Sequence, residues 1–367
     1  MGKFLTNFNP MQNQVYRMIG LMSGTSGDGL DIAYCEFQKT DQWHFELAAC
    51  ETVPFPDKLL KKLKKAHLLS GLKLSLLDVK FGKWMGTQVK EFVERHQLNP
   101  DAVASHGHTV FHQPSKGLSL QIGNGWALHH ASGLRVINDF RMGDVQLGGQ
   151  GAPLVPIGDR LLFSEFDYCI NLGGIANISM EQNGQRIAFD ICPFNLLLNH
   201  FAAACGKPFD QNGKLAKKGK LLSGQLKKLN ALPYYQKAGA KSLGREDLEP
   251  FLHILEMSEE HQPEHILHTL VAHYVQQIKA VMTPRKDRPT AVLVTGGGAF
   301  NTYFMDQFKE NLGSDYILSE ADHKLIGFKE ALIFAFLGTL RLAGQINCLA
   351  TVTGASRDSI GGTVYGV

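Results

Sequence analysis

The chain alternates short apolar runs with longer amphipathic stretches. The apolar runs have the length and composition of buried strands. They are Met18–Met22, Ala102–Ser105, Leu134–Asn138 and Ala291–Val294. Apolar residues recur at helical spacing in a second set of segments, which therefore predict helices. These are Lys58–Lys65, Asp78–His96, Phe194–Cys205, Glu264–Met282, a segment from Asn301, and Lys329–Leu342. Strands that alternate with helices predict an α/β fold.

One arrangement occurs near the start of each half of the chain. Met18–Met22 ends at a turn of Gly, Ser, Thr and Asp, and Leu30–Phe37 then alternates as a second strand. Tyr168–Met180 repeats strand, glycine turn and strand, and Arg186–Asp190 is a short strand that ends on an acid. The repeat predicts two structurally related domains with a cleft between them. The lysine-rich segment Gly206–Arg245 is expected to form surface loops.

Composition narrows the function classes. The 367 residues carry a net charge of +3, which gives no electrostatic case for nucleic acid as the main partner. The N-terminal segment lacks the apolar core of a signal peptide, and no apolar run reaches the 18 residues of a membrane span. None of the six cysteines forms a CxxC pair, so reduced thiols are expected. The sequence predicts a cytoplasmic protein with no membrane partner.

The turn Ser23–Asp31 is the first candidate for chemistry. Its glycines let backbone N–H groups approach a ligand closely, and its hydroxyls add donors, which suits phosphate oxygens. Asp28 and Asp31 would repel phosphate unless a magnesium ion lay between them. The alternative is a plain hairpin turn. The Gly-Lys-Ser/Thr ending of a Walker A motif is missing.

A second glycine turn, Thr295–Asn301, follows a buried strand and opens a helix. A ligand can approach closely there and meet the helix N-terminus, which indicates a nucleotide role rather than a structural turn. The turn lacks the GxGxxG spacing of a dinucleotide fold.

Several polar groups stand where strands end. Asp190 is placed to take a proton from a hydroxyl or water, although a strand-end Asp alone is more often a cap. Asp139, Arg141 and Asp144 form a charged cluster, interpreted either as a salt bridge or as the rim of a sugar site. His106, His108 and His112 fit no standard metal pattern, and their polar neighbours favour hydrogen bonds to a ligand.

Together these segments resemble one family, the anhydro-N-acetylmuramic acid kinases. The matching segments run along nearly the whole chain. They are 20–26, 28–31, 105–110, 121–123, 139–141, 148–156, 171–177, Asp190, 241–242, 244–246, 296–301, 330–331 and 353–355. The resemblance implies an α/β protein of two ribonuclease-H-like domains, the fold of actin, sugar kinases and heat-shock ATPases, with ATP in an interdomain cleft. We expect residues 1–140 to form the first domain and residues 141–367 the second, while the tail Val352–Val367 packs on either.

The resemblance also implies a reaction. An ATP- and Mg²⁺-dependent kinase opens 1,6-anhydro-N-acetylmuramic acid with water and phosphorylates the freed 6-hydroxyl, in peptidoglycan recycling. Asp190 would activate the water, and Glu330 would hold the water or the sugar. Four residues would face the sugar: His106, Asp139, Arg141 and Gln150. The phosphate loop would comprise Ser23, Gly24, Thr25, Ser26, Gly27, Asp28, Gly29, Leu30 and Asp31, with Asp28 and Asp31 toward the metal. The other nucleotide residues would be Gly173, Gly174, Asn177, Gly296, Gly297 and Gly298. A homodimer is also implied.

The sequence departs from the family pattern beside Asp190. The family usually has Asp-Thr-Gly-Pro-Gly-Asn, whereas this chain has Ile191, Cys192 and Phe194 at the threonine and the two glycines. A cysteine could fill space that the substrate needs. Two alternatives therefore stay open: a kinase of the same fold for another amino or anhydro sugar, and a nucleotide-binding protein without kinase activity.

Overall fold

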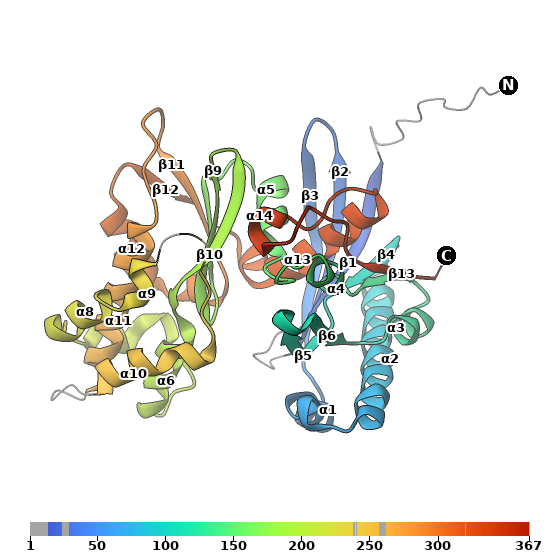
Figure 1. The fold of residues 1–367 in the computed structure, drawn as a ribbon, viewed down its shortest axis with the longest axis horizontal. Helices are drawn as coiled ribbons and strands as arrows, with labels where there is room; N and C mark the ends of the chain where they lie inside the picture. Colours follow the sequence, from blue (N-terminus) through green and yellow to red (C-terminus); the bar gives the residue numbers. More distant parts are fainter. Residues whose placement is uncertain are drawn as a thin grey trace. The chain divides into compact units, whose positions relative to one another are not determined.

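The structure is a computed structural model. It describes residues 14–23, 29–237, 239, 241–256, 262–319 and 321–366, without the side chains of Arg245 and Glu246. The chain forms two compact units (Figure 1). Unit 1 contains Met1–Leu162 and Phe328–Val367, and unit 2 contains Phe163–Gly327. The units thus divide the chain at other positions than the expected ranges 1–140 and 141–367, because the chain leaves unit 1 after residue 162 and returns to it at residue 328.

Unit 1 is built on a six-stranded sheet of order β13-β7-β4-β1-β2-β3. β1, β2 and β3 are antiparallel neighbours, β4 and β7 add in parallel, and β13 closes the edge antiparallel to β7. The strands are β1 (Val15–Ser23), β2 (Leu30–Lys39), β3 (Trp43–Val53), β4 (Ala102–Ser105), β7 (Arg135–Asn138) and β13 (Thr363–Tyr365). A separate hairpin joins β5 (His108–Gln113) to β6 (Leu118–Ile122).

Alternating side chains of β1 pack on opposite faces of this sheet. Ile19 and Leu21 belong to the core shared with the helices on one face. On the other face, α13 comes so close that a β-carbon on Gly20 would overlap the Ala331 carbonyl. The helices of unit 1 are α1 (Asp57–Lys64), α2 (Gly71–His96), α3 (Gly125–Ser132), α4 (Met142–Gln146), α5 (Val155–Leu162), α13 (His323–Leu342) and α14 (Ala350–Thr353). Residues 323–327 at the start of α13 belong to unit 2, and the tight approach of the rest of α13 to β1 explains why the chain from Phe328 on belongs to unit 1.

Unit 2 repeats the topology of unit 1. Its five-stranded sheet has the order β10-β9-β8-β11-β12, with β8, β9 and β10 antiparallel and β11 and β12 added in parallel. The strands are β8 (Tyr168–Leu172), β9 (Ile175–Gln182), β10 (Gln185–Pro193), β11 (Thr290–Thr295) and β12 (Tyr316–Ser319). Three antiparallel strands followed by two parallel ones is the ribonuclease-H-like order, so the expected α/β fold with two related domains is confirmed.

Helices of unit 2 bury an apolar core against its sheet. That core joins side chains of β8, β9, β10 and β11 to the helices α6, α10, α11 and α12. The helices are α6 (Asn195–Ala204), α7 (Lys214–Lys218), α8 (Ser223–Asn230), α9 (Pro233–Gln236), α10 (Glu249–Glu256), α11 (Pro263–Ala280) and α12 (Thr302–Leu312). The segment 206–245, expected to form loops, thus carries the three short helices α7, α8 and α9.

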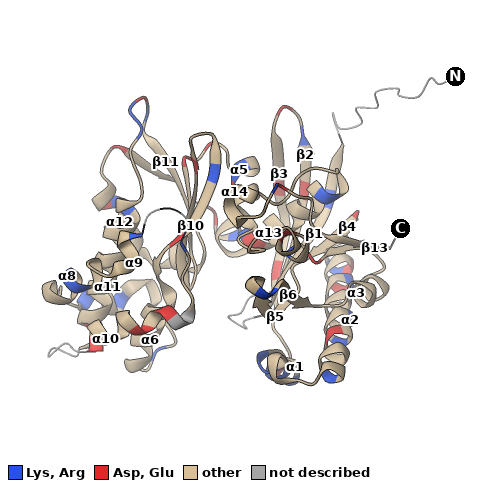
Figure 2. Ribbon diagram, in the orientation of Figure 1, with Lys and Arg blue, Asp and Glu red and all other residues tan. Residues whose placement is uncertain are grey.

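Charged residues are distributed over both units with both signs (Figure 2). In α1 the lysines are exposed while Leu59 and Leu63 are buried, as expected for an amphipathic helix with a solvated basic face. None of the described helices is long and apolar enough to cross a membrane.

Candidate functional site

The turn between β1 and β2 is only partly within the described residues. Gly24, Thr25, Ser26, Gly27 and Asp28 lie outside them. The flanking strands form the expected hairpin, with Ser23 paired to Leu30. Ser23 is buried, and its hydroxyl lies 3.1 Å from Nδ1 of His108. Asp31 accepts a hydrogen bond from the Thr52 hydroxyl at 2.6 Å, which fixes one of its carboxylate oxygens beside the turn.

A buried hydrogen-bond network in unit 1 orients Arg141. Its Nε and Nη2 lie 3.0 and 2.9 Å from Nε2 of His106, and Nη1 donates to the Gly151 carbonyl at 2.7 Å. Nδ1 of His106 lies 2.9 Å from the Gly107 carbonyl, so Nδ1 carries the proton and Nε2 accepts. Burial and the nearby guanidinium hold the pKa of His106 well below its ordinary value of 6.5. The imidazole is therefore neutral.

Among the described residues, the charged cluster of Asp139, Arg141 and Asp144 forms no salt bridge. Within the described part of the chain, Arg141 donates to His106 and Gly151, and its hydrogen bonds go to neither Asp139 nor Asp144. Burial lowers the pKa of Arg141 to about 10, which leaves it charged at neutral pH. Such a cation, fixed in place but without a carboxylate partner of its own in this network, suits an anionic ligand.

Asp144 instead organises the loop that precedes α5. Its buried carboxylate accepts hydrogen bonds from the Gly151 N–H and the Thr353 hydroxyl, both at 2.7 Å, and from the Cys348 thiol at 3.1 Å. The Gln150 N–H donates to the Thr353 carbonyl at 2.8 Å, and the Gln150 side chain is exposed. The C-terminal tail therefore fixes the loop that carries one predicted sugar ligand and the carbonyl that holds Arg141. Sequence spacing gave no signal for this role of Asp144.

Two further predicted residues of unit 1 are exposed carboxylic acids. Asp139 has a left-handed φ of 57° and accepts from the Met142 N–H at 3.4 Å. Glu330 lies on α13. Desolvation of the carboxyl group raises the pKa of Glu330 above its ordinary value of 4.5. The positive charge of Arg141 opposes this rise, and the negative charge of Asp31 adds to it. The structure thus brings Asp31 and Arg141 within electrostatic reach of Glu330.

In unit 2, Asp190 is held at a bulge near the end of β10. Its Oδ2 accepts from the Leu243 N–H at 2.9 Å, and its carbonyl accepts from the Tyr234 hydroxyl at 2.6 Å. The register shifts between Asp190 and Cys192, and such bulges re-aim side chains beside active sites. Burial raises the pKa of Asp190 above its ordinary value of 3.8, while the Leu243 hydrogen bond opposes that rise.

A row of polar residues crosses the unit 2 sheet beside the glycine turns. Asp190 pairs with Asn177, Asn177 with Asn171, and Asn171 with Thr295 across four adjacent strands. Residues paired in this way present side chains on the same face. Gly296 continues the row with φ of 82°, and a β-carbon there would overlap Asn171. The predicted base and the predicted nucleotide residue Asn177 are thus neighbours.

The other predicted nucleotide residues are the two glycine turns of unit 2. Gly173 and Gly174 alone connect β8 to β9. Gly297 and Gly298 begin a 3₁₀ turn that leads to α12, whose first turn is capped by Asn301 through the Phe304 N–H at 3.1 Å. This cap confirms the helix expected from Asn301.

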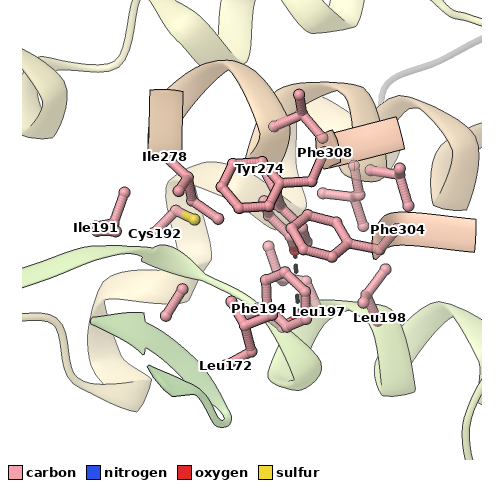
Figure 3. Packing of buried hydrophobic residues seen from close by; sticks show 14 of the residues in the cluster. Leu172, Ile191, Cys192, Phe194, Leu197, Leu198, Tyr274, Ile278, Phe304 and Phe308 are labelled. Atoms are coloured by element: carbon pink, nitrogen blue, oxygen red, sulfur yellow. Dashed lines mark hydrogen bonds between the residues drawn. The ribbon is translucent and has the colours of Figure 1, made fainter. Parts of the chain in front are cut away.

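The departures beside Asp190 point into the unit 2 core (Figure 3). Ile191, Cys192 and Phe194 are at most 1% exposed and pack among the helices behind the sheet. Burial also raises the pKa of the Cys192 thiol, which is therefore neutral. Their side chains fill core volume rather than space beside the Asp190 carboxylate. Their presence therefore does not argue for a different sugar substrate.

The other two histidines of the predicted cluster, His108 and His112, form hydrogen bonds within unit 1. His108 bonds to Ser23, and Nδ1 of His112 lies 3.0 Å from the Ser119 hydroxyl. Burial lowers the pKa of both imidazoles, so they join the site as neutral hydrogen-bonding groups.

Comparison with known proteins points to one family. The family model described as anhydro-N-acetylmuramic acid kinase matches residues 16–367. A protein of that name from Sulfurimonas denitrificans is 33% identical over 95% of this chain and 98% of its own length. Proteins of the same name from Francisella tularensis subsp. novicida and Pseudomonas fluorescens are 32% and 33% identical, over 94% and 95% of this chain and 97% and 98% of their own lengths.

Proposed function

The chain belongs to the anhydro-N-acetylmuramic acid kinase family, and from this we propose that it is an ATP-dependent kinase of 1,6-anhydro-N-acetylmuramic acid. The product is N-acetylmuramic acid 6-phosphate, and the role is peptidoglycan recycling. The observation that carries the proposal is Asp190. Its carboxylate has a raised pKa, is held by one backbone N–H, and stands in one row with Asn177 beside a glycine turn.

Asp190 acts as the general base. It takes a proton from a water molecule, whose oxygen bonds to the anomeric carbon of the sugar while the bond from that carbon to O6 breaks. The freed O6 takes the γ-phosphoryl group, and ADP leaves. A base works best when its pKa approaches the working pH, so the raised pKa of Asp190 favours this role. Glu330, which also has a raised pKa, holds the water or the sugar.

Arg141 binds the lactyl carboxylate of the sugar. Neutral His106 and the Gly151 carbonyl hold the guanidinium without cancelling its charge. A preoriented guanidinium forms charge-assisted bonds at low entropic cost. Asp139 and Gln150 are both exposed near this network. Asp139 accepts hydrogen bonds from the sugar hydroxyls, and Gln150 donates or accepts them.

The glycine turns hold ATP. Gly296, Gly297 and Gly298 lie beside the nucleoside, and Gly173, Gly174 and Asn177 beside the phosphates. Ser23–Asp31 is the phosphate loop of unit 1. Carboxylate oxygens are the ligands that Mg²⁺ prefers, and Asp31 fits because its carboxylate is fixed at the end of this turn by Thr52. We propose that Asp28 and Asp31 hold Mg²⁺, which neutralises charge on the phosphates when bound.

Asp190→Asn tests the base. Asparagine keeps an oxygen for the Leu243 N–H but cannot take the proton, so kcat should fall at least about a hundredfold while the Kd for ADP stays unchanged. Asp322→Asn is the matched control, since Asp322 also accepts one backbone N–H, from Leu325, and is exposed. Wild-type kcat in Asp190→Asn would remove Asp190 as the base. Turnover of other amino sugars, but not of the anhydro sugar, would contradict the substrate.

We further propose a homodimer in the cytoplasm, on the strength of the family resemblance. Light scattering of the purified protein, with a mass twice that of the 40.5 kDa chain, would support the dimer.

A further inference from the structure

Phe194 lies between the two glycine turns of unit 2, and we propose that it is a positioning residue that holds both turns in the shape that binds the nucleotide. This inference rests on the proposed function, because it assigns ATP to those turns. Phe194 itself is fully buried, so it acts on the nucleotide only through the glycines.

The backbone around Phe194 is tied to the first turn. The Phe194 N–H donates to the Gly174 carbonyl at 2.8 Å, and the Leu196 N–H donates to the same oxygen at 3.1 Å. The Asn195 N–H donates to the Gly173 carbonyl at 3.2 Å. The junction of β10 with α6 thus fixes both glycines through their backbone, since a glycine has no side chain that could pack.

The ring of Phe194 supports the second turn. A β-carbon on Gly298 would overlap Cε1 of Phe194 and would come within 2.7 Å of Cβ of Leu172. The turn therefore rests directly on the ring edge, where the missing side chain of Gly298 leaves room for it. A smaller side chain at position 194 would leave a void into which the turn could settle, and the N–H groups around Gly297 would lose their positions.

The core of unit 2 holds the ring itself in place (Figure 3). The rings of Tyr274 and Phe304 lie 4.9 Å from Phe194 between centroids, and the Phe304 ring meets it edge-on at 86°. The Tyr274 hydroxyl donates to the Phe194 carbonyl at 3.3 Å. Both α11 and α12 therefore fix the residue, and through it the positions of two turns that lie far apart in sequence.

Phe194→Leu tests the proposal, with Phe308→Leu as its matched control. Phe308 is equally buried in the same core and stacks on Phe304. Calorimetry with ADP and Mg²⁺ should give a Kd raised about tenfold in Phe194→Leu, and the KM for ATP should rise by the same factor with kcat nearly unchanged. Phe308→Leu should lower the melting temperature but leave both constants at their wild-type values.

The outcomes separate this inference from the proposed function. Wild-type protein that binds no ADP would overturn the proposed function. Wild-type protein that binds ADP, together with a Phe194→Leu variant of unchanged Kd and lowered melting temperature, would overturn the role of Phe194 alone. If leucine prevents folding, Phe194→Met keeps a similar volume without the flat ring edge. A folded methionine variant with wild-type affinity would likewise overturn the proposal.

Discussion

Nε2 of His106 accepts hydrogen bonds from Arg141, so protonation of His106 would disturb the position of Arg141. In the folded protein its pKa lies well below 6.5, whereas in the unfolded chain it is ordinary. Below pH 6.5 the unfolded chain therefore binds a proton that the folded protein refuses, so stability is lost as pH falls. This single group should cost on the order of 1 kcal/mol at pH 5.5 relative to neutral pH.

His106→Gln should remove that part of the pH dependence. Urea unfolding at pH 7.5 and 5.5, followed by fluorescence, measures it, and His130→Gln on the exposed side of α3 is the control. The same loss of stability between the two pH values in His106→Gln and in wild-type protein would show that His106 is protonated in the folded state.

At the residue scale, the sequence indicates which groups matter but not what holds them. Asp190 and Arg141 are recognisable as candidates from strand ends and motifs. The partners that fix them, Leu243 for Asp190 and Gly151 for Arg141, are backbone groups, and backbone groups carry no residue signature. Likewise, the register shift after Asp190 and the burial of Phe194 in the core are features of the structure that the sequence does not show.

At the scale of elements, α5 and α13 are joined by a buried ion pair. Nζ of Lys329 lies 2.7 Å from Oδ1 of Asp159, and both side chains are 5% exposed. Lys329→Ala would leave the Asp159 carboxylate buried without its cation, which typically costs about 3–5 kcal/mol. We expect a lower urea midpoint for unfolding and, since Glu330 follows Lys329 on α13, a lower kcat.

The double variant Asp159→Leu/Lys329→Met distinguishes charge from packing. Apolar residues of similar size commonly replace a buried pair without loss, so its stability should return to near the wild-type value. A double variant as unstable as Lys329→Ala would show that packing, and not the lost charge, sets the cost.

Elements with a strong apolar period were predictable, and those without one were not. β1, β4 and β11 lie where the apolar runs place them, and α11 follows its helical period. β3 carries Glu46 and Glu51 on an edge strand with few buried positions, which hides its period. The lysines of α7 and α8 hide those helices in the same way.

At the scale of the whole molecule, two similar domains were predictable from the repeated strand, glycine turn and strand. The boundaries were not, because they depend on contacts between distant parts of the chain. α13 belongs to unit 1 through the close approach at Gly20, and β13 through its pairing with β7. Neither contact leaves a pattern in the local sequence.

Removal of the C-terminal tail should therefore damage unit 1 and spare unit 2. A chain that ends at Leu342 lacks β13 and the Thr353 hydroxyl that holds Asp144, while none of the described tail residues 343–366 belongs to the unit 2 core. Hydrogen exchange should speed up in β7 and in residues 142–151, whereas β8 and β11 should keep their protection. Kinase activity should be lost, because the Gly151 carbonyl no longer holds Arg141.

Thr353→Val gives the local form of the same test. It removes one hydrogen bond to a buried carboxylate, which should cost about 1.5–3 kcal/mol and speed up exchange in residues 142–151 while β7 stays protected. If the shortened chain exchanged equally fast in β8 and β11, the two units would unfold as one, and the tail would stabilise the whole chain. If it exchanged as slowly as wild type in residues 142–151, the loop would hold Arg141 without the tail.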